Sequence, residues 1–458
     1  APLARDLKRH PGASLIIAGE QQPPLVHALA HAMNHALGNV GETVRYTEPV
    51  EANPIQQTES LRELVSDMQA GSLDTLLVLG GNPAFTASAD LGFVDALAKV
   101  KLRVHLSLYQ DETSALCHWH IPEAHFLESW SDSRAYDGTV TILQPLIAPL
   151  YGGKTAHEML ASLTSQPDQS SYEIVRGYWQ QHYPGAPSSG SKTAVPQASA
   201  AFEQFWRKSL HDGIVAGTAL PPKSVTLAGR PALPPQSDGK TGLDIVFRPD
   251  PYIHDGQFAN NGWLQELPKP HTRLTWDNAA LISPATAERL GLGNEEVVEL
   301  QYEGRKLEAP VWILPGQPND SVTLHLGYGR LRTGRVGRGA GFNTYAIRTA
   351  GAPWFGFGLQ LSKTGRRYQL ACTQHHHSME GRNPVRAGTL EEYHKHPEFV
   401  REMGEEASQS LSMYPPRKNE GNAWGMTIDL SSCTGCNACT IACQSENNIA
   451  VVGKEQVI

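Results

Sequence analysis

Residues 75–110 of the chain read TLLVLGGNPAFTASADLGFVDALAKVKLRVHLSLYQ. The stretch opens with TLLVLGGNP (75–83), a short apolar run that ends in a glycine turn and favours a buried strand. It continues with SADLGFVDALAKV (88–100), whose apolar residues have helical spacing, and closes on LRVHLSLYQ (102–110), which is strand-like again. A strand, a helix and a strand in succession predict a parallel crossover unit of an α/β sheet.

The residues before this unit extend the same pattern. A strand is predicted at SLIIAGE (14–20), and helices are predicted at PLVHALAHAMNHALGN (24–39) and PIQQTESLRELVSDMQAG (54–71). We therefore predict an α/β domain with a doubly wound sheet over residues 1–165. Ligands of such sheets bind at the carboxyl ends of the strands, where GGNPA (80–84) lies. Taken alone, this turn is a weak signal, because most glycine turns are only turns.

Histidines and carboxylates cluster in the second half of this domain. They are His118, His120 and His125 in CHWHIPEAHFLESW (117–130), followed by Asp132 and Asp137. These side chains can bind a metal ion, but no closed ligand set with an accepted spacing is present. A loop whose histidines hydrogen-bond to the backbone is the favoured interpretation.

The middle of the chain changes character twice. Residues 166–240 are expected to be a linker with one short helix at AFEQFWRKSLHDG (201–213), because PGAPSSGSKTAVPQASA (184–200) is of low complexity. Residues 241–350 are rich in short strands separated by glycine and proline, which predicts a β-barrel-like domain. Within it, a hairpin is expected to turn at Glu303-Gly304.

Two segments of this later part have unusual composition. GYGRLRTGRVGRGAGFN (327–343) combines glycines and arginines that could cradle a phosphate, although a flexible surface loop explains them equally well. Residues 351–423 are expected to be an extended connector, with a short helix at TLEEYHKHPEFVREM (389–403). The connector contains His375, His376 and His377, which suit either a proton-handling loop or polar packing at a domain junction.

Four of the six cysteines lie close together in residues 424–458, after a strand predicted at NAWGMTIDL (422–430). They are Cys433, Cys436, Cys439 and Cys443, with the spacing C-x2-C-x2-C-x3-C. This is the spacing of the bacterial ferredoxin run, whose thiolates bind a cubane iron–sulfur cluster. A zinc site would favour two separated C-x2-C knuckles, and disulfides do not favour such dense spacing. Gln444 stands where the simple ferredoxin run has proline, and the further ligands of a two-cluster module are expected either in a longer protein, beyond Ile458, or in a partner that completes the site.

Composition narrows the possible functions. The 458 residues carry a formal charge of −8, which gives no electrostatic case for binding nucleic acid. No apolar run approaches the roughly 18 residues that a spanning helix needs, and the first residues lack the apolar core of a signal peptide. Cys117 and Cys372 are expected to be free and buried, so cysteine usage indicates a metal cluster and does not define the compartment.

Several of these segments resemble the molybdopterin oxidoreductase superfamily over roughly residues 12–350. The resemblance is carried by LVLGGNPAFTASAD, by QDETSALCHWHIPEAHFLESWSDSRAYDGTVTILQPLIAPLYGGKTAHEML (110–160) and by TWDNAALISPATAERLGLGNEEVVEL (275–300). The last stretch is similar to the C-terminal dinucleotide-binding β-barrel domain of that superfamily. The superfamily's molybdenum ligand and its first cluster-binding domain have no counterpart in these residues.

The cysteine segment resembles a more specific family. WGMTIDLSSCTGCNACTIACQSENNIAVVGKEQV (424–457) looks like the start of the iron–sulfur domain in the large iron–sulfur subunit of bacterial alternative complex III. That family fuses a molybdopterin-enzyme-like region to a ferredoxin-like region in the same order. The resemblance implies that Cys433, Cys436 and Cys439 bind one 4Fe–4S cluster and that Cys443 binds an adjacent one. It also implies no molybdopterin, a 3Fe–4S cluster in the complete protein, and three further cysteine runs beyond Ile458.

The resemblance carries an expectation for function. It implies an electron-transfer subunit without its own catalytic site, peripheral on the periplasmic face of the bacterial cytoplasmic membrane. Electrons from quinol, oxidised in a polytopic membrane subunit, are expected to pass through its clusters to multi-haem and mono-haem c-type cytochrome subunits. Two alternatives remain: a molybdenum-dependent reductase of the polysulfide or thiosulfate type, and an assembly platform whose cluster only stabilises the fold.

Overall fold

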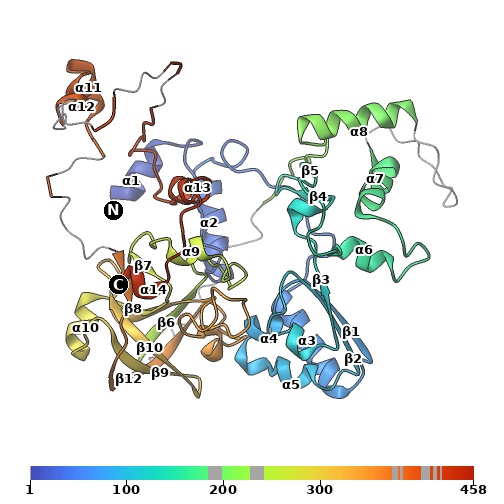
Figure 1. Ribbon diagram of the computed structural model, residues 1–458, viewed down its shortest axis with the longest axis horizontal. Helices are drawn as coiled ribbons and strands as arrows, with labels where there is room; N and C mark the ends of the chain where they lie inside the picture. The colour runs from blue at the N-terminus through green and yellow to red at the C-terminus, as the bar shows by residue number, and fades with distance from the viewer. Residues whose placement is uncertain are drawn as a thin grey trace. The chain divides into compact units, whose positions relative to one another are not determined.

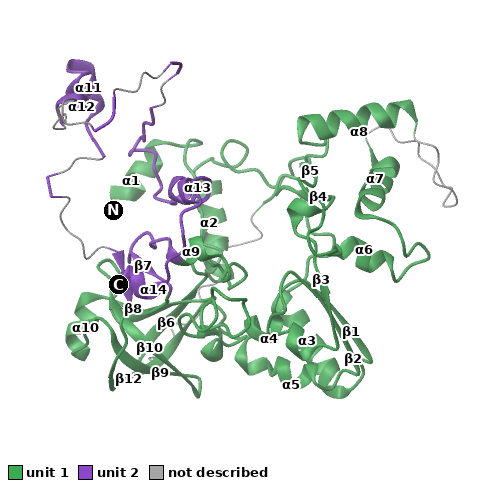
Figure 2. Cartoon of the chain, viewed as in Figure 1, with its two compact units in different colours: residues 1–265, 277–369 green, residues 266–276, 370–458 purple. Residues whose placement is uncertain are grey.

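The computed structural model describes residues 2–183, 199–226, 242–373, 380–381, 385–403, 413–415, 420–422 and 425–458 (Figure 1). The chain forms two compact units (Figure 2). Unit 1 comprises residues 1–265 and 277–369, and unit 2 comprises residues 266–276 and 370–458. Within the described ranges, no helix is both long enough and apolar enough to span a bilayer.

Unit 1 contains a three-stranded parallel sheet. Its strands are β1 (Thr75–Leu79), β2 (Leu102–Ser107) and β3 (Trp119–Pro122), in that spatial order. The predicted strands at 75–83 and 102–110 are confirmed as β1 and β2. The third strand was missed, because it lies in the histidine-rich segment that was expected to be a loop.

The prediction of a doubly wound sheet is wrong. Strands that are neighbours in the chain are also neighbours in the sheet, so the strand order has no reversal point. The predicted strand at 14–20 does not form either. Instead, the Asn34 side chain forms hydrogen bonds with both backbone groups of Ile16. The Ile16 N–H donates to Asn34 Oδ1 at 2.9 Å, and Asn34 Nδ2 donates to the Ile16 carbonyl at 2.7 Å. A side-chain amide thus satisfies the groups that a neighbouring strand would have paired.

Helices precede and connect these strands. They are α1 (Pro2–Arg9), α2 (Pro24–Ala36), α3 (Gln57–Ala70), α4 (Pro83–Thr86) and α5 (Phe93–Leu97), with the 3₁₀ turns η1 (Ala89–Leu91), η2 (Ser114–Leu116) and η3 (Phe126–Glu128). The predicted helices at 24–39 and 54–71 are confirmed as α2 and α3, and α3 ends as expected at Gly71, which has a φ of 70°. Buried Met68 and Leu97 join α3 to α5 in one apolar cluster.

A second apolar cluster lies where a linker was expected. It joins the hairpin of β4 (Ser131–Arg134) and β5 (Val140–Leu143) to α7 (Ser171–His182) and α8 (Ala200–Asp212), after the short helix α6 (Ala156–Ala161). The predicted helix at 201–213 is confirmed as α8, whereas α7 was missed. Trp179, Phe202 and Trp206 are buried in this cluster. Both helices are therefore packed into an apolar core and do not form the expected linker. The low-complexity residues 184–198 lie outside the described ranges.

The rest of unit 1 is a closed six-stranded barrel, which confirms the expected β domain. In chain order its strands are β6 (Leu243–Arg248), β8 (Ala280–Ile282), β9 (Glu296–Tyr302), β10 (Arg305–Ile313), β11 (Ser321–His325) and β12 (Phe355–Arg367). Strand β12 pairs with both β6 and β9 and closes the barrel. The barrel therefore extends past the expected boundary at residue 350 into the segment expected to be a connector.

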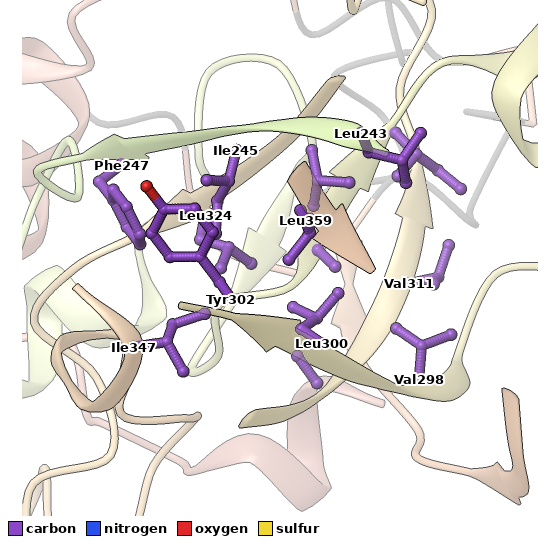
Figure 3. Packing of buried hydrophobic residues seen from close by; sticks show 14 of the residues in the cluster. Leu243, Ile245, Phe247, Val298, Leu300, Tyr302, Val311, Leu324, Ile347 and Leu359 are labelled. Atoms are coloured by element: carbon purple, nitrogen blue, oxygen red, sulfur yellow. The ribbon is translucent and has the colours of Figure 1, made fainter. Parts of the chain in front are cut away.

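The barrel interior is filled by alternate side chains of its strands. On β6, Leu243, Ile245 and Phe247 point inward, where Figure 3 shows them facing Leu300 and Leu359.

The hairpin between β9 and β10 turns at Glu303 (φ 45°) and Gly304 (φ 75°), as predicted. Helix α10 (Pro284–Leu290) is capped by the Ser283 hydroxyl and ends at Gly291. Unit 1 also contains the 3₁₀ turn η4 (Thr344–Ile347) and all of helix α9 (Gly262–Glu266) except its last residue, Glu266, which belongs to unit 2.

Gly329 tests how tightly the glycine- and arginine-rich loop is packed. Its φ is 79°, and a Cβ at this position would lie 2.2 Å from the Asn343 backbone nitrogen. Gly329→Ala is expected to lower the free energy of unfolding by about 3 kcal/mol or more, because strain and overpacking add. Gly316→Ala is the control: its φ is 91°, but nothing lies within 4 Å, so we expect only about 1–2 kcal/mol. Equal urea midpoints for the two variants would contradict this view of the loop.

Unit 2 contains the end of the chain. Its elements are β7 (Leu274–Thr275), β13 (Ala371–Cys372), α11 (Leu390–Lys395), α12 (Phe399–Glu402), α13 (Ala438–Glu446) and α14 (Lys454–Val457). The single helix expected over 389–403 is divided into α11 and α12, with Pro397 between them. Residues 425–430, expected to be part of a strand, have no regular structure.

Candidate iron–sulfur site

The cysteine run begins in a tight turn of unit 2. The Cys433 N–H donates to the Asp429 carbonyl at 3.0 Å and closes this turn. Gly435 and Asn437, on either side of Cys436, have left-handed φ values of 69° and 60°. Two left-handed residues two positions apart curve the backbone sharply, and glycine and asparagine tolerate this conformation best.

Helix α13 holds the other two cysteines. Cys439 and Cys443 are four residues apart, so they lie one turn apart on the same helix face. Asn447 donates from Nδ2 to the Cys443 sulfur at 3.6 Å. All four thiols of the run are free and exposed.

Cys436 has the most favourable surroundings for a thiolate. Hydrogen bonding by the Ala438 backbone and the Thr434 side chain lowers the pKa of the Cys436 thiol. The thiolate is the form that binds iron. The surroundings of Cys436, a predicted ligand, therefore favour its thiolate form.

The donor chemistry of the run fits an iron–sulfur cluster, since it consists of thiols alone. The described residues do not bring the four sulfurs together, however. No group of three or more histidines, cysteines or carboxylates within them is placed to hold a metal ion. The assignment of Cys433, Cys436, Cys439 and Cys443 as ligands stays a prediction.

The histidines and carboxylates that were singled out between residues 118 and 137 each bond to a different neighbour. His118 Nδ1 accepts from the Arg103 N–H at 3.1 Å, and His125 caps the turn at Leu127. Asp132 accepts from the Trp179 indole, and Asp137 accepts from the Thr139 N–H. Among the described residues, these contacts favour hydrogen-bonded histidines over a metal site, but the expected loop is in part a strand, because His120 lies in β3.

A buried polar network that was not predicted includes His120. His105 is fully buried on β2; its Nε2 donates to the Gly81 carbonyl at 3.0 Å, and its Nδ1 lies 2.8 Å from the Ser114 hydroxyl. The same hydroxyl lies 3.0 Å from His120 Nδ1. Burial, and then the neighbouring His105, lower the pKa of His120. The one sequence signal for this network is a histidine between two apolar residues of β2, Val104 and Leu106.

The glycine- and arginine-rich loop is attached to the α/β part of unit 1 by a buried ion pair. Arg330 Nη2 donates to Glu112 Oε2 at 2.7 Å, and the same carboxylate accepts from the Leu331 and Arg332 N–H groups. Asn82, in the GGNP turn, donates to it as well. Arg330 is therefore already neutralised within the protein, which weakens the phosphate-cradle interpretation.

The two remaining cysteines and the three adjacent histidines were also singled out in the sequence. Neither Cys117 nor Cys372 forms a disulfide, as expected; Cys372 is buried, whereas Cys117 is only partly buried. His375, His376 and His377 lie outside the described residues.

Thiol reactivity can test the surroundings of Cys436. In metal-free protein, we expect Cys436 to be alkylated by iodoacetamide at lower pH than Cys117, because hydrogen bonds lower the pKa of Cys436 whereas burial raises that of Cys117. Peptide mass spectrometry across a pH series measures both residues in one sample. Superimposable pH profiles would show that the hydrogen bonds to the Cys436 sulfur do not form.

Comparison with known proteins adds an independent line of evidence. The chain is 24% identical over 328 residues to the molybdopterin-binding-like subunit of menaquinone reductase from Nitratidesulfovibrio vulgaris (strain Hildenborough). It is also 74% identical over 27 residues to the iron–sulfur cluster-binding subunit of menaquinone reductase from the same organism. One chain thus resembles two separate subunits.

The extent of these matches differs. The first covers 65% of this chain and 43% of the relative, so the chain spans less than half the length of that subunit. The second covers 6% of this chain and 11% of the relative. Among solved structures, acetylene hydratase from Pelobacter acetylenicus aligns with a TM-score of 0.42 and 16% identity, over 66% of this chain and 46% of that one. No protein-family model matches the chain.

Proposed function

We propose that this chain is an electron-transfer subunit of a membrane-associated respiratory complex that exchanges electrons with a quinone. The observation that carries the proposal is the joining, in one chain, of similarity to a molybdopterin-binding-like subunit and to an iron–sulfur subunit. The 27-residue match is short but high in identity, and we infer that it falls on the cysteine run.

Cys433, Cys436 and Cys439 are proposed to bind one 4Fe–4S cluster, and Cys443 is proposed to bind a neighbouring cluster. A bound cluster supplies one-electron transfer, and its potential depends on hydrogen bonds to sulfur, on charge and on burial. This chain's contribution is to position the thiolates and to donate N–H groups to them, as Ala438 does at Cys436.

The partners and the direction of electron flow belong to the same proposal. We propose quinol oxidation in a polytopic membrane subunit, with c-type cytochromes as electron acceptors and peripheral attachment on the periplasmic face. The curated relatives are named for menaquinone reduction, the opposite direction. Reduction of the clusters by added menaquinol, followed by cytochrome reduction in the purified complex, would support our direction. If menaquinone oxidised the clusters faster than menaquinol reduced them, the direction of electron flow would be the opposite of the one proposed.

Metal content tests the proposal most directly. Iron analysis and low-temperature electron paramagnetic resonance (EPR) of the isolated complex are expected to show iron–sulfur signals, without stoichiometric molybdenum. Absence of every iron–sulfur signal would refute an electron-transfer role for this chain.

The similarity to a molybdopterin-binding-like subunit favours a second candidate, a molybdenum-dependent reductase of the polysulfide or thiosulfate type. Molybdenum at one atom per chain would favour this candidate. Full electron-transfer activity in molybdenum-free protein would exclude it.

A further inference from the structure

We propose that residues 266–276, here called the strap, position the cysteine run through Glu266 and Pro268. The strap is part of unit 2 although it lies far from the cysteines in the sequence. The proposal rests on the proposed function, because it assigns a role toward the cluster that the run is proposed to bind. Glu266 and Asn437 are positioning residues in this view, not ligands.

The first attachment lies within the cysteine run. Asn437 directly follows Cys436, and its Nδ2 donates to the Pro268 carbonyl at 3.0 Å. Its left-handed backbone, with a φ of 60°, is the bend that leads into α13. The strap thus holds the chain between the second and third cysteines.

The second attachment follows the run. The Glu266 carboxylate accepts the backbone N–H of Val452, at 3.1 Å from Oε1 and 3.0 Å from Oε2, and also the N–H of Gly453. The Trp276 indole N–H lies 3.3 Å from the same carboxylate. Hydrogen bonds to an ionised carboxylate are among the stronger ones, so this attachment is stable.

The strap is itself rigid. Its strand β7 pairs with β13, with Leu274 opposite Cys372 and Thr275 opposite Ala371. A tight turn precedes β7, in which the Arg273 N–H donates to the Lys269 carbonyl at 3.0 Å. Leu274 is 2% exposed. The two attachments therefore lead to one fixed segment.

Together the attachments bracket α13, which holds Cys439 and Cys443. Because the chain is bonded to the strap before and after this helix, the two attachments restrain the helix that holds both sulfurs. Loss of either attachment is expected to let water closer to a bound cluster. Water stabilises the more highly charged reduced state, so the midpoint potential should become more positive.

Two variants and two matched controls test this role in the complete complex. Glu266→Gln removes the charge of the second attachment, and Asn437→Gly removes the first while keeping a residue that favours a left-handed φ. Glu455→Gln removes the same charge two residues after Gly453, from an exposed side chain. Asn448→Gly changes another left-handed asparagine, with a φ of 47°, in the same segment.

Iron content and an EPR-monitored redox titration are measured for all four variants. We expect unchanged iron and a positive shift in the midpoint potential of one cluster in Glu266→Gln and Asn437→Gly, and wild-type values in both controls. Iron loss in the two test variants alone, with an unchanged thermal transition of unit 1, would also support the proposal. Wild-type potentials and line shapes in the two test variants would overturn it.

Cys436→Ser distinguishes failure of the proposed function from failure of the proposed role of the strap. If this variant keeps every iron–sulfur signal, the proposed function fails at this site. If it loses a signal while Glu266→Gln and Asn437→Gly match the wild type, only the role of the strap fails.

Discussion

Replacing Arg330 by methionine is expected to lower the free energy of unfolding of unit 1 by about 3–5 kcal/mol, because the mostly buried Glu112 carboxylate loses its charge partner. The Arg330 side chain is only 6% exposed and that of Glu112 is 16% exposed. The guanidinium also donates to the Gly256 carbonyl at 2.8 Å and lies 5.3 Å from the centre of the Phe85 ring. Methionine fills similar space but provides none of these bonds.

A matched control exists on the same loop. Arg338 is exposed, and Arg338→Met is expected to change stability by no more than about 0.5 kcal/mol. Urea unfolding of both variants measures the difference. A double variant with Glu112→Gln should cost less than the sum of the two single changes, since it removes both members of the pair. If Arg330→Met and Arg338→Met lowered stability equally, the ion pair of Arg330 with Glu112 would not stabilise the fold.

The lowered pKa of Glu112 predicts that the stability of the fold depends on pH. Burial tends to raise its pKa, but hydrogen bonds from Arg330 and Arg332, together with the Arg330 charge, lower the pKa to about 2 from an ordinary 4.5. A lowered folded-state pKa stabilises the fold above pH 4.5 and loses that effect as the pH falls toward 2. Between pH 7 and pH 3, wild-type protein should therefore lose more stability than Glu112→Gln. Parallel losses in urea midpoint would argue against a lowered pKa.

Cys436→Ser is expected to remove one cluster, a loss of roughly four iron atoms per chain, because serine does not supply the soft thiolate that the cluster requires. EPR and iron analysis of the complete complex measure this loss. Cys117→Ser changes a free thiol in the α/β part and should leave the iron content unchanged. Iron loss in both variants would point to misfolding instead of ligand removal.

The same variant addresses the assembly-platform alternative. If the cluster carries electrons, its loss should abolish electron transfer from quinol to cytochrome through this chain. If the cluster only stabilises a platform, electron transfer should continue in complexes that still assemble. Size-exclusion chromatography of the variant complex establishes assembly before the rates are compared.

Short-range features of the fold were predictable from local sequence. Helix α3 and its end at Gly71, the capped helix α10 and the turn at Glu303-Gly304 all depend on neighbouring residues. Apolar periodicity and glycine turn chemistry act over a few residues, so they can be recognised without a partner segment. The spacing of the four cysteines is equally local, which is why it indicates a cluster even before the fold is known.

Features that join distant segments were not predictable. Strand β12 closes the barrel between β6 and β9, and Asn34 satisfies a backbone that was expected to form a strand. Glu112 and Arg330 are 218 residues apart, and the strap binds residues 169 and more positions away. Such pairs depend on which surfaces the folded chain brings together. Residue type and periodicity therefore suffice for the elements and the cluster motif, while long-range packing sets the closed barrel, the buried ion pair and the attachment of the cysteine run.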